Sequence, residues 1–281
     1  MSGRAQRNRL PSERALIRRL QQRARLIGDD CAILPGSRDD ILITTDQFVE
    51  EVHFRRSTHR AADVGHAALA RGLSDIAAMG GRPTHALVSL ALPPWVGARW
   101  LDGFYRGFFA LAARYGVELV GGDLSHAAQF YCDVVVLGRV RRGQALRRDG
   151  ARPGDRIYVS GPLGKPRKRP EPRLELGRQL VGWASACMDL SDGISLDLAR
   201  LCEASGAGAE LTFVPVARGA TLDAALHRGE DYELLFTARK PLPALSRAPL
   251  EIGRIVAGRQ IRFQGRPLPP RGYDHFASLK E

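Results

Sequence analysis

Aspartates at the ends of apolar runs are the residues of this sequence that could act together in chemistry. They stand in five separate segments, Gly28-Asp29-Asp30, Thr44-Thr45-Asp46, Ser74-Asp75, Gly121-Gly122-Asp123 and Asp189-Leu190-Ser191-Asp192. A carboxylate placed where a buried strand ends projects into the crevice beyond the sheet edge, where α/β proteins bind ligands. Carboxylates that converge within about 4–6 Å need a cation between them, because otherwise their pKa values rise. The pattern therefore predicts a cation site built from several segments.

Mg²⁺ is the cation that this set of donors favours. Magnesium is usually held by one or two carboxylates per ion, while waters and substrate phosphates complete its octahedron. Single aspartates on several loops suit that arrangement better than a closed protein cage. Gly121 and Gly122, directly before Asp123, would let the backbone approach phosphate oxygens closely. These observations predict phosphoryl transfer, in which magnesium bridges the phosphates and neutralises developing charge.

Each segment also has a purely structural interpretation. Gly28-Asp29-Asp30 alone is more typical of a turn, His53 alone is more typical of a structural histidine, and Asp189 and Asp192 are candidate helix caps. Asp75 is harder to explain structurally, because an acid inside the apolar run LSDIAAMG must find a partner. Their joint occurrence favours a functional site. The sequence has no Walker A motif, GxGxxG, kinase HRD or DFG set, so its phosphoryl chemistry belongs to another architecture.

The elements that must position these residues alternate between helix and strand. Apolar periodicity and glycine or proline stops predict helices over residues 12–26, 61–79, 96–115, 174–186 and 195–204. Strands are predicted over residues 31–34, from 41 onward, and over 84–92, 117–120, 131–140, 156–160, 210–213, 232–237, 251–256 and 260–263. This order predicts an α/β (α+β) protein. Turn residues 149–155 divide it into domains 1–150 and 151–281, and the basic, proline-rich residues 165–173 predict an exposed, mobile loop.

Composition excludes several classes of protein. The 281 residues are 44% hydrophobic and 26% charged, and no apolar run approaches the roughly 20 residues of a membrane span. The N-terminus lacks the apolar core of a secretory signal. The four cysteines, Cys31, Cys132, Cys187 and Cys202, lie far apart without a CxxC pair, which predicts free thiols and a cytoplasmic protein. The net charge of +12 comes from arginines spread along the chain, which favours compositional bias over specific nucleic-acid binding.

Taken together, eight blocks of the sequence resemble the thiamine-monophosphate kinase family, within the superfamily of aminoimidazole ribonucleotide synthetase. In the order of the family, the blocks are IGDDCAIL, ITTDQFVEEVHF, ARGLSDIAAMGGRP, YGVELVGGD, GARPGDRIYVSG, MDLSDGISLDLARL, GEDYELLFT and GYDHF. The resemblance implies magnesium-dependent, direct in-line transfer of the γ-phosphoryl group of ATP onto thiamine monophosphate, giving thiamine diphosphate. It also implies two domains with the active cleft between them, and a homodimer joined through the strands of the N-terminal domains.

The same resemblance implies roles for individual residues. The metal ligands would be Asp30, Thr44, Thr45, Asp46, Asp75, Asp123, Asp189 and Asp192, with Asp46, Asp75, Asp123 and Asp192 as the catalytic set. ATP would contact Tyr105, Gly122, Asp123, Arg148 and Ser191. Thiamine monophosphate would contact His53, Glu230 and Tyr273, and the ring of Tyr273 would offer its face to the cationic thiazolium.

Three positions depart from the pattern of the family, and two other functions remain open. The segment after Gly161 is short and carries the basic residues 165–173, Arg228 replaces a glycine before Gly229, and His126 stands where the family often has arginine or another polar residue. One alternative is another ATP- and Mg²⁺-dependent enzyme of the superfamily, of the selenophosphate- or aminoimidazole-ribotide-synthetase type. The other is a non-catalytic nucleic-acid-binding protein. The blocks VEEVHF, GEDYEL and GYDHF favour thiamine monophosphate as the acceptor.

Overall fold

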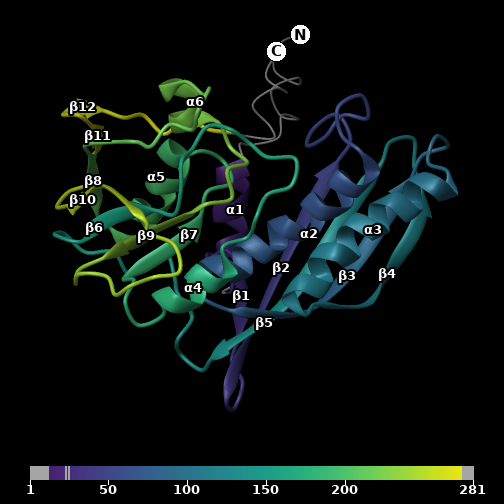
Figure 1. The fold of residues 1–281 in the computed structure, drawn as a ribbon. Helices are drawn as coiled ribbons and strands as arrows, with labels where there is room; N and C mark the ends of the chain where they lie inside the picture. Colours follow the sequence, from purple (N-terminus) through teal and green to yellow (C-terminus); the bar gives the residue numbers. More distant parts are fainter. Residues whose placement is uncertain (1–12, 23, 25, 274–281) are drawn as a thin grey trace, which may run out of the picture.

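The computed structural model describes residues 13–22, 24 and 26–273 of the chain. Two β-sheets organise it, one in each half of the sequence, and helices pack on both (Figure 1). The first sheet has the strand order β1-β2-β5-β3-β4, and the second has the order β12-β11-β8-β10-β6-β9-β7. This mixed α/β architecture confirms the predicted fold class.

The first sheet is mostly antiparallel and carries two long helices. Its strands are β1 (Ala32–Leu34), β2 (Asp39–Val49), β3 (Arg82–Leu92), β4 (Glu118–His126) and β5 (Tyr131–Arg141), and only the β3–β4 pair is parallel. The helices α2 (Ala61–Ala78) and α3 (Ala98–Tyr115) lie side by side over one face (Figure 1). Alternate residues of β2 and β5, such as Leu42 and Val136, are buried on that face, as the two-residue period of a strand requires.

Close contact between α2 and α3 depends on two glycines. A Cβ atom on Gly65 would lie 1.9 Å from the carbonyl oxygen of Phe104, and one on Gly107 would lie 1.9 Å from that of Ala62. Any larger residue would push the helices apart. Because α2 carries Ser74 and Asp75, this packing fixes the position of both relative to the sheet.

Within the described residues, the second sheet has seven strands against five in the first, but most of its strands are shorter. Its strands are β6 (Arg156–Val159), β7 (Ala186–Asp189), β8 (Gly208–Leu211), β9 (Leu234–Ala238), β10 (Leu250–Val256), β11 (Ile261–Phe263) and β12 (Arg266–Pro267). The helices of this half are α4 (Leu174–Leu180), α5 (Ile194–Ser205) and α6 (Leu222–His227), and α1 (Glu13–Gln21) contacts α5 through an ion pair between Arg18 and Glu203.

The hydrophobic core does not stop at the boundary between the two sheets. One cluster joins Leu42 and Ile76 of the first half to Leu176 of α4 and Phe236 of β9. A second cluster lies within the second half, around Leu198 of α5. The two sheets are therefore held together by shared apolar packing along α2 and α4. Among the described residues, no helix combines the length and the apolar character that a membrane span requires.

Several predicted boundaries differ from the structure. The helix predicted over residues 174–186 is wrong beyond Leu180, because Gly182 takes a φ of +80° and residues from Ala186 onward pair with β9. The strand predicted over 117–120 continues to His126, since Gly121 and the residues after it pair with β3. The helix α6 was not predicted. The helix predicted over 12–26 ends at Gln21, and its residues 12, 23 and 25 lie outside the described residues.

Residues 165–173 are irregular, as predicted, but they are not a loosely attached surface loop. Pro170 and Pro172 are buried, and the carbonyl oxygen of Pro170 bonds to the His66 ring at 2.9 Å. Arg169 Nε donates a 2.6 Å hydrogen bond to Asp63 of α2. The predicted exposure is therefore confirmed for residues 165 and 167–169, which are exposed, and wrong for Pro170 and Pro172, which are buried.

Candidate active site

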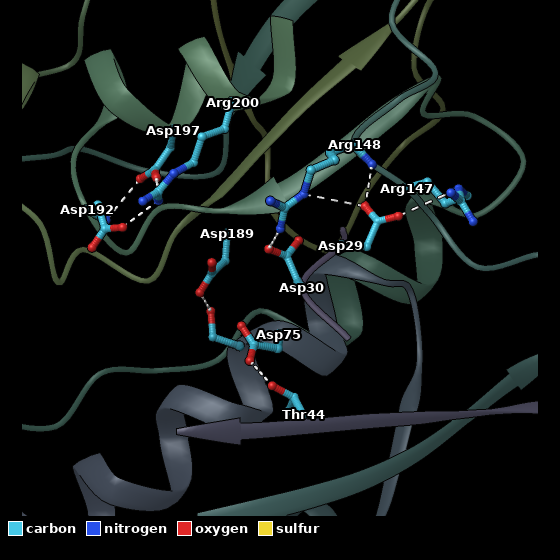
Figure 2. Close-up of polar contacts among 11 residues, drawn as sticks. Asp29, Asp30, Thr44, Asp75, Arg147, Arg148, Asp189, Asp192, Asp197 and Arg200 are labelled. Carbon is cyan, nitrogen blue, oxygen red and sulfur yellow. Dashed lines mark hydrogen bonds and ion pairs between the residues drawn. The ribbon is translucent and has the colours of Figure 1, made fainter. Parts of the chain in front are cut away.

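Three carboxylates from three different elements meet between the two sheets. Asp30 precedes β1, Asp75 lies in α2 and Asp189 ends β7, and each offers an oxygen atom within 4.8 Å of the others (Figure 2). The first two come from the first half of the chain and the third from the second half. We call these three residues the carboxylate cluster. Its existence requires both halves to be folded and packed together.

Short polar contacts position each member of the cluster. Thr44 Oγ1 donates a hydrogen bond to Asp75 Oδ2, and Ser74 Oγ donates one of 2.6 Å to Asp189 Oδ2. Arg148 Nη2 donates one of 2.5 Å to Asp30 Oδ1 (Figure 2). The other oxygen of Asp30, Oδ2, is buried and has no hydrogen-bond partner among the described residues.

The electrostatics of the cluster favour a bound cation. Burial, together with the neighbouring carboxylates, raises the pKa of Asp75 and of Asp189 well above the ordinary range of an aspartate. Burial also raises the pKa of Asp30 to about 6, although the Arg148 guanidinium opposes this effect. A divalent cation would relieve both the desolvation and the mutual repulsion. The all-oxygen donor set and the partnerless Oδ2 of Asp30 fit Mg²⁺.

Two arginines frame the cluster, Arg148 from the segment between β5 and β6 and Arg200 from α5. The Nε atom of Arg148 lies 3.5 Å from Asp29 Oδ1. The backbone N–H of Arg148 donates a 2.8 Å hydrogen bond to the same oxygen. Arg200 of α5 bonds both Asp192 and Asp197 (Figure 2). Asp197 Oδ2 accepts hydrogen bonds from the backbone N–H groups of Asp192 and Gly193, at 3.0 and 3.1 Å, and so caps the start of α5. These bonds hold the 189–193 loop in place.

The three residues predicted to contact thiamine monophosphate line one cavity. His53, Glu230 and Tyr273 surround a volume of about 160 Å³ that also touches Ser191 and Asp192. An adjoining cavity of about 320 Å³ shares His53 and Glu230 with it and extends to residues 166–168. We call the smaller volume the acceptor pocket. The structure therefore places the predicted acceptor residues beside the loop that follows Asp189.

The loop that carries Glu230 has an unusual backbone. Glu230 and Tyr232 both have positive φ angles, +67° and +49°, which cost free energy for residues other than glycine. Their N–H groups donate hydrogen bonds of 2.7 and 2.9 Å to the carbonyl oxygens of Ser191 and Leu190. Backbone strain of this kind occurs often at functional sites. Here the hydrogen bonds fix the acceptor pocket against the 189–193 loop.

Asp46 lies beside the cluster, near the end of β2. It faces Arg71, and its charge acts on Asp75 and Asp189, raising the pKa of both. Burial raises the pKa of Asp46 itself, while the Arg71 guanidinium opposes the rise. Asp46 therefore belongs to the same electrostatic group as the cluster, although it is not one of the three closest carboxylates.

Four other predicted residues lie apart from the cluster within the described chain. Thr45 points to the opposite face of the sheet from Thr44, where its Oγ1 donates a 2.7 Å hydrogen bond to Asp133. Asp123 and Gly122 are exposed on β4, the edge strand of the first sheet. Tyr105 packs on Phe104 and Phe109 of α3. Position 122 also requires glycine for a structural reason, since a Cβ atom there would lie 1.8 Å from the carbonyl oxygen of Val88.

Sequence reasoning missed several residues that the structure places in the site. Ser74 was noted only as the neighbour of Asp75, yet it bonds Asp189. Arg200 and Asp197 hold the loop after Asp189.

Arg71 is a further residue that sequence reasoning missed. It lines the acceptor pocket and faces Asp46. The i, i+4 spacing of Arg71 and Asp75 on a predicted helix was the available signal, because it places both on one face.

Comparison with known proteins agrees with this fold. Residues 28–140 match the family described as AIR synthase related protein, N-terminal domain. The chain is 34% identical to the thiamine-monophosphate kinase of Salmonella typhimurium over 305 residues, covering 90% of this chain and 92% of the relative. It is 33% identical to that of Aquifex aeolicus, covering 90% and 94%. Residues 28–140 thus form an AIR synthase related domain.

Solved structures give the same result. A structure described as "AaThiL complexed with AMPPCP and TMP" has a TM-score of 0.88 and 31% identity, and covers 94% of this chain and 97% of its own. The thiamine-monophosphate kinase of Stenotrophomonas maltophilia has a TM-score of 0.77 and 33% identity, covering 90% and 96%. The chain belongs to the thiamine-monophosphate kinase family.

Proposed function

We propose that this protein transfers the γ-phosphoryl group of ATP onto the phosphate of thiamine monophosphate, giving ADP and thiamine diphosphate. The observation that carries the proposal is the position of the acceptor pocket, lined by His53, Glu230 and Tyr273. It lies beside the loop after Asp189, the last residue of β7, and beside Arg71, which faces Asp46 near the end of β2. Membership of the family supports the substrates, because a similar structure is described as complexed with AMPPCP, an ATP analogue, and TMP.

The carboxylate cluster would hold Mg²⁺, together with the predicted ligands Thr44, Asp46 and Asp192. The other two predicted ligands, Thr45 and Asp123, lie apart from the cluster in the described chain. Bound magnesium supplies charge neutralisation for the transferring phosphoryl group. The residues of the chain supply positioning. Thr44 and Ser74 orient two of the cluster carboxylates through hydrogen bonds, and Arg148 orients the third. No side chain of the site needs to form a covalent intermediate, since the acceptor is itself a phosphate.

ATP would bind against Arg148 and Ser191. Arg148 suits this role because its guanidinium already lies beside Asp30, where the phosphates must meet the cation. Ser191 lies between the cluster residue Asp189 and the acceptor pocket. The other predicted ATP contacts, Tyr105, Gly122 and Asp123, lie apart from the cluster in the described chain.

We also propose a homodimer that forms through the first sheet. The strand β4 is at the edge of that sheet, and Val120 and Leu124 on it are 52% and 63% exposed. An exposed apolar edge strand offers a ready surface for pairing with another chain. A cytoplasmic location is supported by the four cysteines, which are buried as free thiols.

A chromatographic assay for thiamine diphosphate tests the proposed function. Purified protein is incubated with ATP, Mg²⁺ and thiamine monophosphate, and parallel reactions omit Mg²⁺ or the acceptor. We expect thiamine diphosphate and ADP in equal amounts in the complete reaction and neither product in quantity without Mg²⁺. Release of ADP without thiamine diphosphate would show that the acceptor is another molecule.

A further inference from the structure

Arg71 lies between the carboxylate cluster and the acceptor pocket. It stands on α2 one helical turn before Asp75, so both side chains are on the same face of the helix. Its side chain is 12% exposed. It lines the acceptor pocket and the adjoining cavity, in each case together with His53 and Glu230. Arg71 therefore shares a helix face with the cluster residue Asp75 and also lines the acceptor pocket.

Two aromatic rings hold the guanidinium of Arg71. Its Cζ lies 5.5 Å from the ring centroid of Phe48 and 5.5 Å from that of Tyr232. Contacts with aromatic rings stabilise a guanidinium and leave its N–H groups, which lie in its own plane, for polar partners. The two rings thus limit the orientations that Arg71 can adopt.

The carboxylates near Arg71 do not fully engage it. Nη1 donates a long hydrogen bond of 3.4 Å to Glu230 Oε1, and Nε lies 3.7 Å from Asp46 Oδ1, beyond hydrogen-bond distance. Within the described part of the chain, Nε makes no hydrogen bond. By comparison, the buried pair of Arg173 with Glu233 is bidentate, and both of its contacts are shorter. Arg71 therefore retains capacity for another anion.

The charge of the pocket points to the identity of that anion. Its lining includes the carboxylates of Asp192 and Glu230, which repel a phosphate, and the guanidinium groups of Arg71 and Arg228, which attract it. A phosphate that accepts a phosphoryl group must lie near the cation site. Of the two arginines, Arg71 is the one that faces Asp46 and shares a helix face with Asp75.

We propose that Arg71 binds the phosphate of thiamine monophosphate and positions it for attack on the γ-phosphoryl group of ATP. The inference rests on the proposed function and assigns a residue to one part of it. Arg71 contributes a planar pair of N–H donors, and Phe48 and Tyr232 hold that pair in place. The competing explanation is that Arg71 only neutralises Asp46 and Glu230.

Thiamine separates the two explanations, because it has the rings of thiamine monophosphate without the phosphate. Calorimetric titration of both ligands, in the presence of Mg²⁺, gives the preference of the protein for the phosphorylated ligand. We expect Arg71→Gln to lower this preference about 10–100-fold by weakening thiamine monophosphate alone, the usual effect of losing a hydrogen bond to a charged group. Arg71→Lys keeps the charge and loses the planar pair, so its preference should be intermediate.

Steady-state kinetics give an independent readout. The KM for thiamine monophosphate should rise in Arg71→Gln by a similar factor, while the KM for ATP stays within about twofold of the unmodified protein. Arg56→Gln is the matched control, because Arg56 also lies over an aromatic ring, 4.6 Å from the centroid of Trp95, and pairs with a carboxylate, Glu50, at 2.8 Å. Arg56 lines neither cavity, so its replacement should leave the preference unchanged.

The other possible results also show whether Arg71 binds the phosphate. If Arg71→Gln and Arg71→Lys keep the preference of the unmodified protein, or weaken both ligands equally, Arg71 does not bind the phosphate. Melting temperatures identify a variant that fails to fold, in which case Arg71→Lys alone carries the test. If the unmodified protein makes no thiamine diphosphate, the proposed function fails. If it does and the variants keep their preference, only the role of Arg71 fails.

Discussion

Ser74 Oγ donates a 2.6 Å hydrogen bond to Asp189 Oδ2, and this bond joins α2 over the first sheet to β7 at the edge of the second. Both residues are buried, at 0% and 3% exposure. The next residue along α2 is Asp75, a member of the carboxylate cluster. Two adjacent residues of one helix thus provide a cluster carboxylate and the anchor for another, so the packing of the two halves determines the geometry of the site.

Replacement of Ser74 by alanine should weaken both the fold and the cation site. The change removes the donor to a buried carboxylate, which typically costs about 1–3 kcal/mol of unfolding free energy. It also removes a hydrogen bond that lowers the pKa of Asp189, so the site should need more Mg²⁺ for half-maximal activity. Denaturant unfolding and a Mg²⁺ titration of activity measure the two effects. Ser185→Ala, which removes a donor to Asp155 outside the cluster, is the control and should leave the Mg²⁺ requirement unchanged.

Stability should depend on pH in opposite ways with and without Mg²⁺. In the metal-free protein the pKa of Asp30 is about 6, above its ordinary value of 3.8, so the folded state binds more protons than the unfolded state between these pH values. The contribution of Asp30 to stability is therefore fully present below pH 3.8 and is lost as the pH rises through about 6. Mg²⁺ binds the ionised carboxylates of the folded state and stabilises it.

Thermal unfolding at pH 5 and pH 8, in EDTA and in saturating Mg²⁺, tests this linkage. The rise in melting temperature caused by Mg²⁺ should be larger at pH 8, where the carboxylates are ionised, and small at pH 5. Asp75→Asn should lose most of the rise at pH 8. Equal rises at the two pH values would argue against a cation held by these carboxylates.

The sequence contained enough information to find the cluster but not to place every expected ligand. Asp30, Asp75 and Asp189 stood out as acids beside apolar runs, and the structure brings these three together. Thr44 and Thr45 are adjacent in a strand, so their side chains must point to opposite faces, and the register of β2 with β5 decides which one faces α2. The division into two folding units near residue 150 stays a prediction.

Elements with ambiguous patterns were harder to predict. The four residues Ala186–Asp189 are all buried, and a short apolar run of this kind fits the end of a helix as well as a strand. Pairing with β9, which is distant in sequence, decides the outcome. The i, i+4 spacing of Arg71 from Asp75 was only a weak signal, because an arginine on a helix normally lies at the surface. The packing of Phe48 and Tyr232 around Arg71 shows that it does not.

Asp46→Asn should lower turnover at least about 10²-fold, because the amide keeps the shape of the side chain and removes a charge beside the cation site. The assay for thiamine diphosphate measures it at saturating substrates. Asp39→Asn, at the other end of the same strand, is the matched control and should retain normal turnover. Near-normal turnover in Asp46→Asn would remove Asp46 from the set of metal ligands.

Leu124→Lys should convert the proposed dimer into a monomer. Leu124 is 63% exposed on the edge strand β4, and a charge at a sheet edge opposes pairing with another chain. Light scattering coupled to gel filtration measures the mass of each variant. Leu222→Lys, at a leucine 44% exposed on α6, is the control and should keep the mass of the unmodified protein. A dimer that survives Leu124→Lys must use another surface.

Arg173→Leu should destabilise the protein strongly, because it leaves a buried carboxylate without its cation. Arg173 Nε donates a 2.7 Å hydrogen bond to Glu233 Oε2, Ser160 Oγ donates another of 2.5 Å, and the Arg173 and Glu233 side chains are 10% and 4% exposed. Breaking a buried ion pair on one side costs about 3–5 kcal/mol, which urea unfolding can measure. Arg178→Leu breaks the exposed pair with Glu175, where both side chains are about half exposed, at 48% and 57%. That control should cost less than about 1 kcal/mol, and similar losses in the two variants would show that burial does not set the strength of the Arg173 pair.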